Sequence, residues 1–123
     1  MKKITIILTI LMLFAFIAGT TAMADNLGAC RARILNLANA CEIWANAHNN
    51  MYPTGQEFLS GEFAEYVRKI GGSDDDFYDP ISWKGLIYEI RSDHKYFKIR
   101  SPNPEKYGLR ELYFDTKWGM VAK

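Results

Sequence analysis

The stretch Leu27–Met51, LGACRARILNLANACEIWANAHNNM, decides the fold. Its apolar positions alternate three and four residues apart, a spacing that places side chains on one face of a helix. The opposite face is polar, and such a helix is stable in water only when its apolar stripe is buried. We therefore expect the rest of the chain to cover this stripe. Its predicted members are Leu27, Cys30, Ile34, Leu37, Cys41, Trp44, His48 and Met51.

The segment after this helix contains clear helix boundaries. We expect the long helix to end at Tyr52, because Pro53 disfavours helical geometry in the residue before it. Thr54 and Glu57 have the spacing of a capping box, which predicts a short helix over 55–59. A second short helix should begin near Glu62 and end at Gly71-Gly72, where glycine permits a left-handed conformation.

From Ser82 onward the chain alternates apolar and polar residues, which is typical of β-strands. Short connections between the strands indicate an antiparallel meander with one apolar face, and that face would cover the long helix. The sequence therefore predicts the α+β class, with a long N-terminal helix packed on three or four antiparallel strands. The predicted strands are 85–91, 96–100, 110–116 and a brief final strand, 120–122.

The first 24 residues have the three parts of a secretory signal peptide: basic residues, an apolar run over 4–19, and small residues at Ala22 and Ala24. We expect cleavage after Ala24, one domain over 25–123, and a periplasmic or secreted location. Two alternatives stay open. The run could remain as a membrane anchor, although it is shorter than the roughly 20 residues of a typical span. The other alternative is lipidation at Cys30, because Leu27–Cys30 loosely resembles a lipobox, the motif that precedes a lipidated cysteine. Asp25 and Asn26 separate this motif from the apolar run, which a lipobox normally adjoins.

Charge and cysteine spacing restrict the partners. Without Lys2 and Lys3 the chain has 13 basic and 14 acidic residues, a balance that argues against a nucleic acid partner.

Export would place Cys30 and Cys41 in an oxidising compartment. Eleven residues of helix separate their Cα atoms by about 16 Å, beyond the ~7 Å limit for a disulfide. Either both are core residues or one links two molecules, so a homo-oligomer stays open.

The sequence contains no motif that indicates catalysis. His48 and His94 lie far apart in the chain, and neither has the neighbouring ligands of a metal site. Cys41 and His48 share a helix face, but two turns would hold them about 10 Å apart, too far for proton transfer. There is no glycine-rich phosphate loop and no nucleophile elbow. We expect neither enzymatic activity nor a bound cofactor.

The loop Ser73–Pro80, SDDDFYDP, is rich in carboxylates. Asp74, Asp75, Asp76 and Asp79 could bind a hard cation such as Ca²⁺, but their spacing differs from that of an EF-hand. We therefore expect a solvated loop. Loops on a rigid scaffold often carry recognition, so the loop Ser73–Asp79 and the predicted turn Ser92–Lys95 are the predicted contact surfaces. The residues concerned are Ser73, Asp74, Asp75, Asp76, Asp93, His94 and Lys95.

The stretch 40–54, ACEIWANAHNNMYPT, followed by Phe58-Leu59, resembles the globular part of type IV pilins and type II secretion pseudopilins. The segments 88–90 and 96–99 are similar to the hairpin of that family. The chain departs from the family in two features: it lacks the prepilin leader and the C-terminal cysteine pair. The resemblance implies a detached pilin-like domain that binds a protein partner at the cell envelope. With an uncleaved helix, it would instead imply a membrane-anchored pilin-type subunit.

Overall fold

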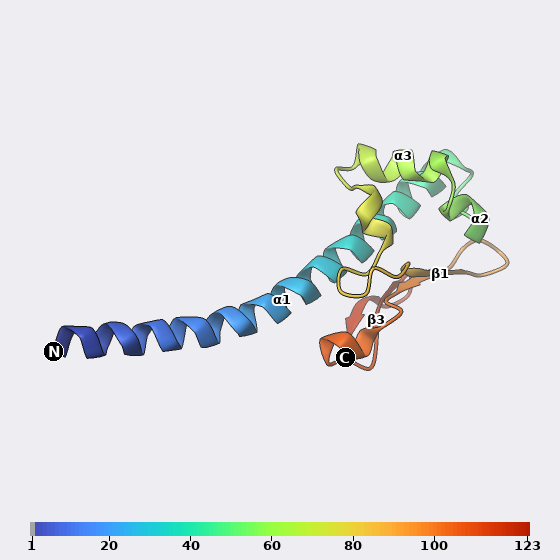
Figure 1. Ribbon diagram of the computed structural model, residues 1–123. Coiled ribbons are helices and arrows are strands. Elements are labelled where there is room, and N and C mark those ends of the chain that lie inside the picture. Colours follow the sequence, from blue (N-terminus) through green and yellow to red (C-terminus); the bar gives the residue numbers. More distant parts are fainter. Residues whose placement is uncertain (1) are drawn as a thin grey trace.

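The computed structural model describes the backbone of residues 2–123 and the side chains of residues 25–123. The first helix, α1 (Lys2–Ala47), begins far from the globular part and ends inside it (Figure 1). The part of α1 after Asp25 packs on a four-stranded antiparallel sheet, so the predicted α+β class is confirmed. The side chains of the predicted signal peptide, 1–24, lie outside the described residues. Among residues 25–123, whose side chains are described, no helix is both long and apolar enough to cross a membrane.

The predicted apolar stripe of α1 is buried over most of its length. Cys30, Ile34, Leu37 and Cys41 are fully buried, and Trp44 is nearly so. Both cysteines are free, as the helical spacing predicts.

The predicted end of this helix at Tyr52 is wrong, because α1 ends at Ala47. Asn49 and Asn50 follow with φ angles of 57° and 59°, a left-handed conformation that asparagine adopts more readily than most residues. The change of direction leaves Met51 42 % exposed, whereas it was predicted to lie on the buried stripe.

Two short helices follow: α3 packs on α1, and α2 packs on α3 and β1. In α2 (Gly55–Phe58) the predicted capping box is confirmed. The Thr54 hydroxyl accepts a hydrogen bond from the Glu57 N–H at 3.0 Å, and the Glu57 carboxylate accepts one from the Thr54 N–H at 2.9 Å. Helix α3 (Gly61–Lys69) buries Phe63 and Val67.

A glycine pair ends α3. Gly71 has a φ of 91°, which confirms the predicted left-handed end. A Cβ on Gly72 would lie 2.5 Å from a carboxylate oxygen of Asp76, so the next segment approaches the chain closely at this residue. That segment is a 3-10 helix, η1 (Asp74–Phe77), which contacts α1 and α3.

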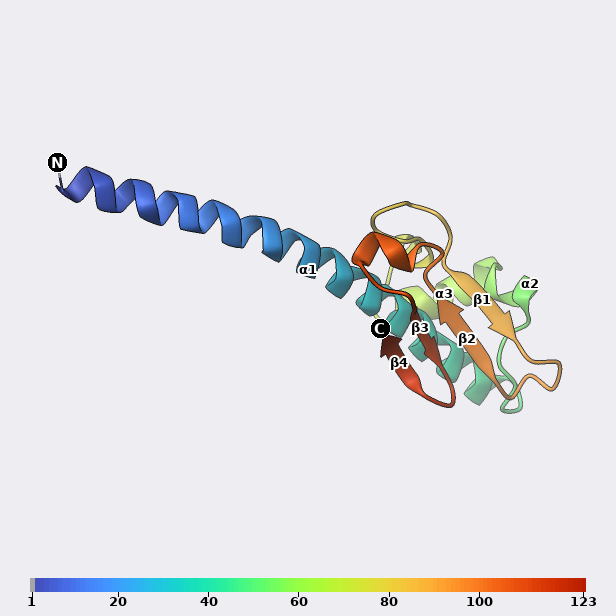
Figure 2. The same ribbon diagram turned by 90° about the horizontal axis from the view of Figure 1, so that it is seen from below.

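The sheet is the predicted meander. Its strands β1 (Ile87–Ile90), β2 (Phe97–Arg100), β3 (Leu112–Asp115) and β4 (Gly119–Ala122) lie side by side in chain order (Figure 2). A second 3-10 helix, η2 (Pro104–Tyr107), separates β2 from β3. Helix α1 covers β2 and β3, while α2 covers β1. Strands β1 and β4 are therefore the opposite edges of the sheet.

Candidate interaction site

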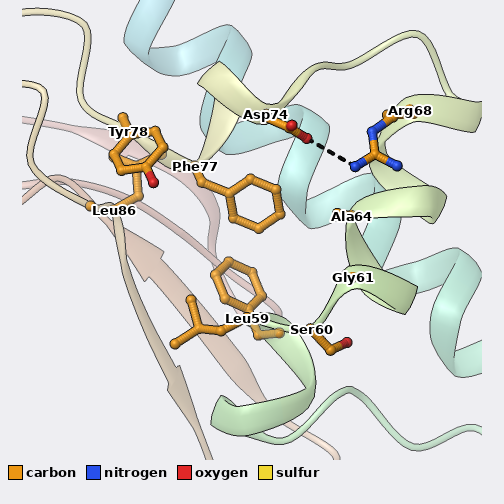
Figure 3. A pocket seen from close by; sticks show the side chains of 11 residues that line it. Leu59, Ser60, Gly61, Ala64, Arg68, Asp74, Phe77, Tyr78 and Leu86 are labelled. Atoms are coloured by element: carbon orange, nitrogen blue, oxygen red, sulfur yellow. Dashed lines mark ion pairs between the residues drawn. The ribbon is translucent and has the colours of Figure 1, made fainter.

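A hollow opens between the two short helices and the segment that leads into β1. It has a volume of about 340 Å³. Figure 3 shows side chains of α3 on one side of it and those of η1 and the following segment on the other. Its apolar lining comes from Phe58, Leu59, Ala64, Phe77, Tyr78 and Leu86. An apolar hollow of this size can accept one large hydrophobic side chain or a small ligand.

One ion pair crosses the rim of this hollow. The Arg68 guanidinium lies 3.4 Å from the Asp74 carboxylate and also donates a hydrogen bond to Glu65 (Figure 3). These contacts hold Arg68 in place above the apolar lining. The side chain of Leu59 lies at the mouth and is 80 % exposed. The arrangement suits apolar contact with a partner, because most of the side chains that line the hollow are apolar.

The predicted solvated acidic loop is only partly correct. Asp74 and Asp75 are exposed, but Asp76 is only 7 % exposed. Its carboxylate accepts hydrogen bonds from the Ser73 N–H at 3.0 Å and from the Asn36 side chain at 3.2 Å. Asp76 is therefore wrong as a contact residue, because its carboxylate already joins η1 to α1. Among the described side chains, no group of three His, Cys, Asp or Glu residues is placed to hold a metal ion.

Asp79 is fully buried, which also corrects the prediction of a solvated loop. One carboxylate oxygen accepts hydrogen bonds from Ser101 at 3.0 Å and Tyr107 at 2.9 Å. The other accepts from the backbone N–H groups of Ile81 at 3.1 Å and Ser82 at 2.9 Å. Burial would raise the pKa of this carboxyl, but the hydrogen bonds outweigh burial and lower it. The carboxylate of Asp79 is thus ionised, has no access to solvent and has a structural role.

The two cysteines lack the properties of reactive thiols. Burial raises the pKa of Cys30 to about 12, and burial also raises the pKa of Cys41 well above its usual value. Both groups are therefore protonated near neutral pH, whereas the thiolate is the nucleophile and the metal ligand.

The side chain of His48 packs against α1. It stacks on Trp44 with ring centroids 3.9 Å apart, and its Nδ1 lies 2.7 Å from the Trp44 carbonyl oxygen.

The predicted contact turn Ser92–Lys95 lies elsewhere in the fold. The His94 carbonyl accepts a hydrogen bond from the Tyr52 N–H at 3.0 Å, and the Lys95 ammonium donates one to the Asn50 carbonyl at 2.8 Å. This turn therefore adjoins the end of α1, whereas η1 packs against the middle of the domain (Figure 1). The two predicted surfaces do not form one site, and a binding role for their exposed residues stays a prediction.

Two exposed tryptophan side chains were not predicted from the sequence. Trp118 is 67 % exposed in the turn between β3 and β4, and Trp83 is 56 % exposed in the segment before β1. The Arg33 guanidinium lies over the Trp83 ring, 4.9 Å from its centroid. Both tryptophans follow a lysine or serine within a turn, outside the alternating pattern, and this position was a usable signal of exposure.

Comparisons of the chain with protein-family models, with curated proteins and with solved structures found no match. The resemblance to pilins and pseudopilins therefore stays a prediction that rests on the sequence stretches 40–59, 88–90 and 96–99.

Proposed function

We propose that the chain is an exported, non-enzymatic, pilin-like domain that acts as a protein–protein interaction or assembly module at the cell envelope. The observation that carries the proposal is the apolar hollow beside α3, with the exposed Leu59 at its mouth. Large exposed apolar side chains around a concave surface are typical of sites that bind another protein. The side chains that line the hollow offer apolar contact and one ion pair at the rim.

The chemistry of the described residues supports a binding role rather than catalysis. Both thiols are buried and protonated, and the fully buried carboxylate of Asp79 is occupied by hydrogen-bond donors from the chain itself. Catalytic groups instead need access to a substrate and a pKa suited to their task.

A membrane-anchored pilin-type subunit with an uncleaved N-terminal helix is the second candidate. One observation favours it: α1 continues without interruption from Lys2 to Ala47, so the backbone helix passes through the predicted cleavage site. In this form the apolar run over residues 4–19 would hold the domain at a membrane.

One experiment separates these forms and tests the proposed role. The full chain, with a C-terminal affinity tag, is expressed in its native host, crosslinked in the envelope and purified. We expect a mature N-terminus at Asp25 and a specific crosslinked protein that is lost in the Leu59→Glu variant. An N-terminus at Met1 would favour the anchored subunit, and the absence of any crosslinked protein would contradict the binding role.

A further inference from the structure

We propose that the hollow beside α3 receives Trp118 of a second copy of this chain, so that the molecules associate head to tail. The inference rests on the proposed assembly role and names the partner of the same site. It starts from two features of one molecule: an apolar hollow of about 340 Å³ and a tryptophan that is 67 % exposed. A tryptophan is among the side chains that contribute most to protein interfaces when they fill such a hollow.

The position of Trp118 suits it to insertion. Asp115 is buried, and its carboxylate accepts hydrogen bonds from the N–H groups of Lys117 at 3.0 Å and Trp118 at 2.5 Å. The second oxygen of Asp115 accepts one from the Tyr96 hydroxyl at 2.9 Å. The backbone of the turn that presents the indole ring is therefore fixed to the sheet, and little backbone entropy is lost when the ring is buried.

The hollow is also organised before binding. Arg68 is held by Glu65 and Asp74 at the rim, where its guanidinium could lie against the face of an inserted indole ring. The apolar floor comes from Phe77 and Leu86, whose backbones are joined by a hydrogen bond of 2.8 Å.

Charge favours a second copy as the occupant over an unrelated apolar protein. The segment that forms the hollow, residues 53–80, contains two basic and seven acidic residues; five of these acids are not buried, and the other two, Asp76 and Asp79, are. The segment that carries Trp118, residues 84–123, contains nine basic and five acidic residues. Locally, Lys117 precedes the inserted tryptophan, while Asp74 lines the hollow and the next residue, Asp75, is also exposed. Opposite charges at the two surfaces would orient the encounter between copies.

The topology determines the type of assembly. The hollow adjoins the segment that leads into β1, whereas Trp118 precedes β4, and these strands are the opposite edges of the sheet. One molecule therefore cannot fill its own hollow, and each molecule offers one donor and one acceptor surface. Such a contact is heterologous and continues into an open chain unless its rotation closes a ring.

The test uses the purified full chain in sedimentation experiments over a range of concentrations at low salt. We expect species that grow beyond dimers as concentration rises. Trp118→Ala, which removes the inserted ring, and Ala64→Phe, which fills the hollow, should each weaken association at least about 30-fold, the loss typical of a central interface tryptophan. Trp83→Ala is the matched control, because it removes an exposed tryptophan outside the hollow and should change nothing.

A mixture of the two variants tests the head-to-tail geometry. Trp118→Ala keeps an open hollow and Ala64→Phe keeps the tryptophan, so a 1:1 mixture should form dimers and nothing larger. Leu59→Glu replaces Ala64→Phe if the latter does not fold, since Leu59 is 80 % exposed. Charge reversal in Lys117→Glu should weaken association, and a second change, Asp75→Lys, should restore it.

Three results would overturn the inference: a wild-type chain that stays monomeric, a Trp118→Ala chain that associates normally, or a closed dimer that persists in both variants. A monomeric wild-type chain that still crosslinks to an envelope protein would leave the proposed binding role standing. The failure of the two proposals can thus be distinguished.

Discussion

The Tyr107 hydroxyl donates a hydrogen bond of 2.9 Å to the carboxylate of Asp79, which is 28 residues earlier in the chain. Asp79 is fully buried and also accepts a hydrogen bond from Ser101. Its second oxygen accepts from the backbone of residues 81 and 82. One carboxylate therefore joins the segment before β1 to η2 and to the end of β2.

Replacement of Asp79 should destabilise the domain strongly. Asp79→Ala leaves buried donors of Ser101 and Tyr107 without an acceptor, and each unsatisfied group costs about 1–3 kcal/mol. We expect the free energy of unfolding to fall by at least about 3 kcal/mol, measured by urea denaturation. Asp75→Ala is the control, because that residue is exposed and should cost less than about 0.5 kcal/mol. An equal effect of the two changes would contradict the role of Asp79.

The same carboxyl should contribute to acid sensitivity. Hydrogen bonds outweigh burial and place its folded pKa below the ordinary value of 3.8, so the unfolded chain binds this proton more readily. The stabilisation from ionised Asp79 is complete above the unfolded pKa and is lost as pH falls through the folded pKa. Urea titrations between pH 6 and pH 2.5, as experimental conditions, should show a shallower decline for Asp79→Asn than for wild type. Parallel curves would show that the carboxyl titrates normally.

The thiols of Cys30 and Cys41 should be unreactive in the native protein. Burial raises the pKa of Cys30 to about 12 and that of Cys41 well above its usual value, so thiolate is scarce at pH 8. We expect a thiol reagent to label neither cysteine in the folded chain and both after denaturation. The intact mass should be the same with and without reductant. Rapid labelling of the native protein would show that one thiol reaches solvent.

The capping box of α2 offers a smaller, local prediction. Thr54→Ala removes the hydroxyl that accepts from the Glu57 N–H, and the expected loss of stability is about 1 kcal/mol by thermal or urea unfolding. Thr54→Ser retains the hydroxyl and should retain most of the stability. A serine variant as unstable as the alanine variant would indicate that the threonine methyl group, not the cap, contributes the energy.

Features set by local spacing could be predicted from the sequence. The alternation in Leu27–Trp44 predicted the buried face of α1, and the alternation around Phe97 and Leu112 predicted the meander. The early end of α1 was missed because Pro53 was taken as the boundary. The adjacent asparagines, Asn49 and Asn50, were the better signal, since they adopt the left-handed conformation that ends the helix.

Features that depend on distant partners could not be predicted. Asp76 and Asp79 were assigned to a solvated loop because consecutive carboxylates usually face water. Their burial depends on Asn36, Ser101 and Tyr107, which are 22 to 40 residues away in the chain. The hollow beside α3 was missed for the same reason, because its two sides come from separate segments that meet only in the folded domain.

The buried carboxylate of Asp79 has a further consequence for how the domain opens. Residues 81 and 82 lie outside any helix or strand, and the amides of such segments usually exchange their protons with solvent within a short time. Here both amides donate to the same carboxylate oxygen of Asp79, so their release would leave that buried oxygen with the Ser82 hydroxyl as its one remaining donor among the described residues. Proton exchange at these two positions should therefore be as slow as in β2, which makes this irregular segment part of the cooperative unit that unfolds as a whole.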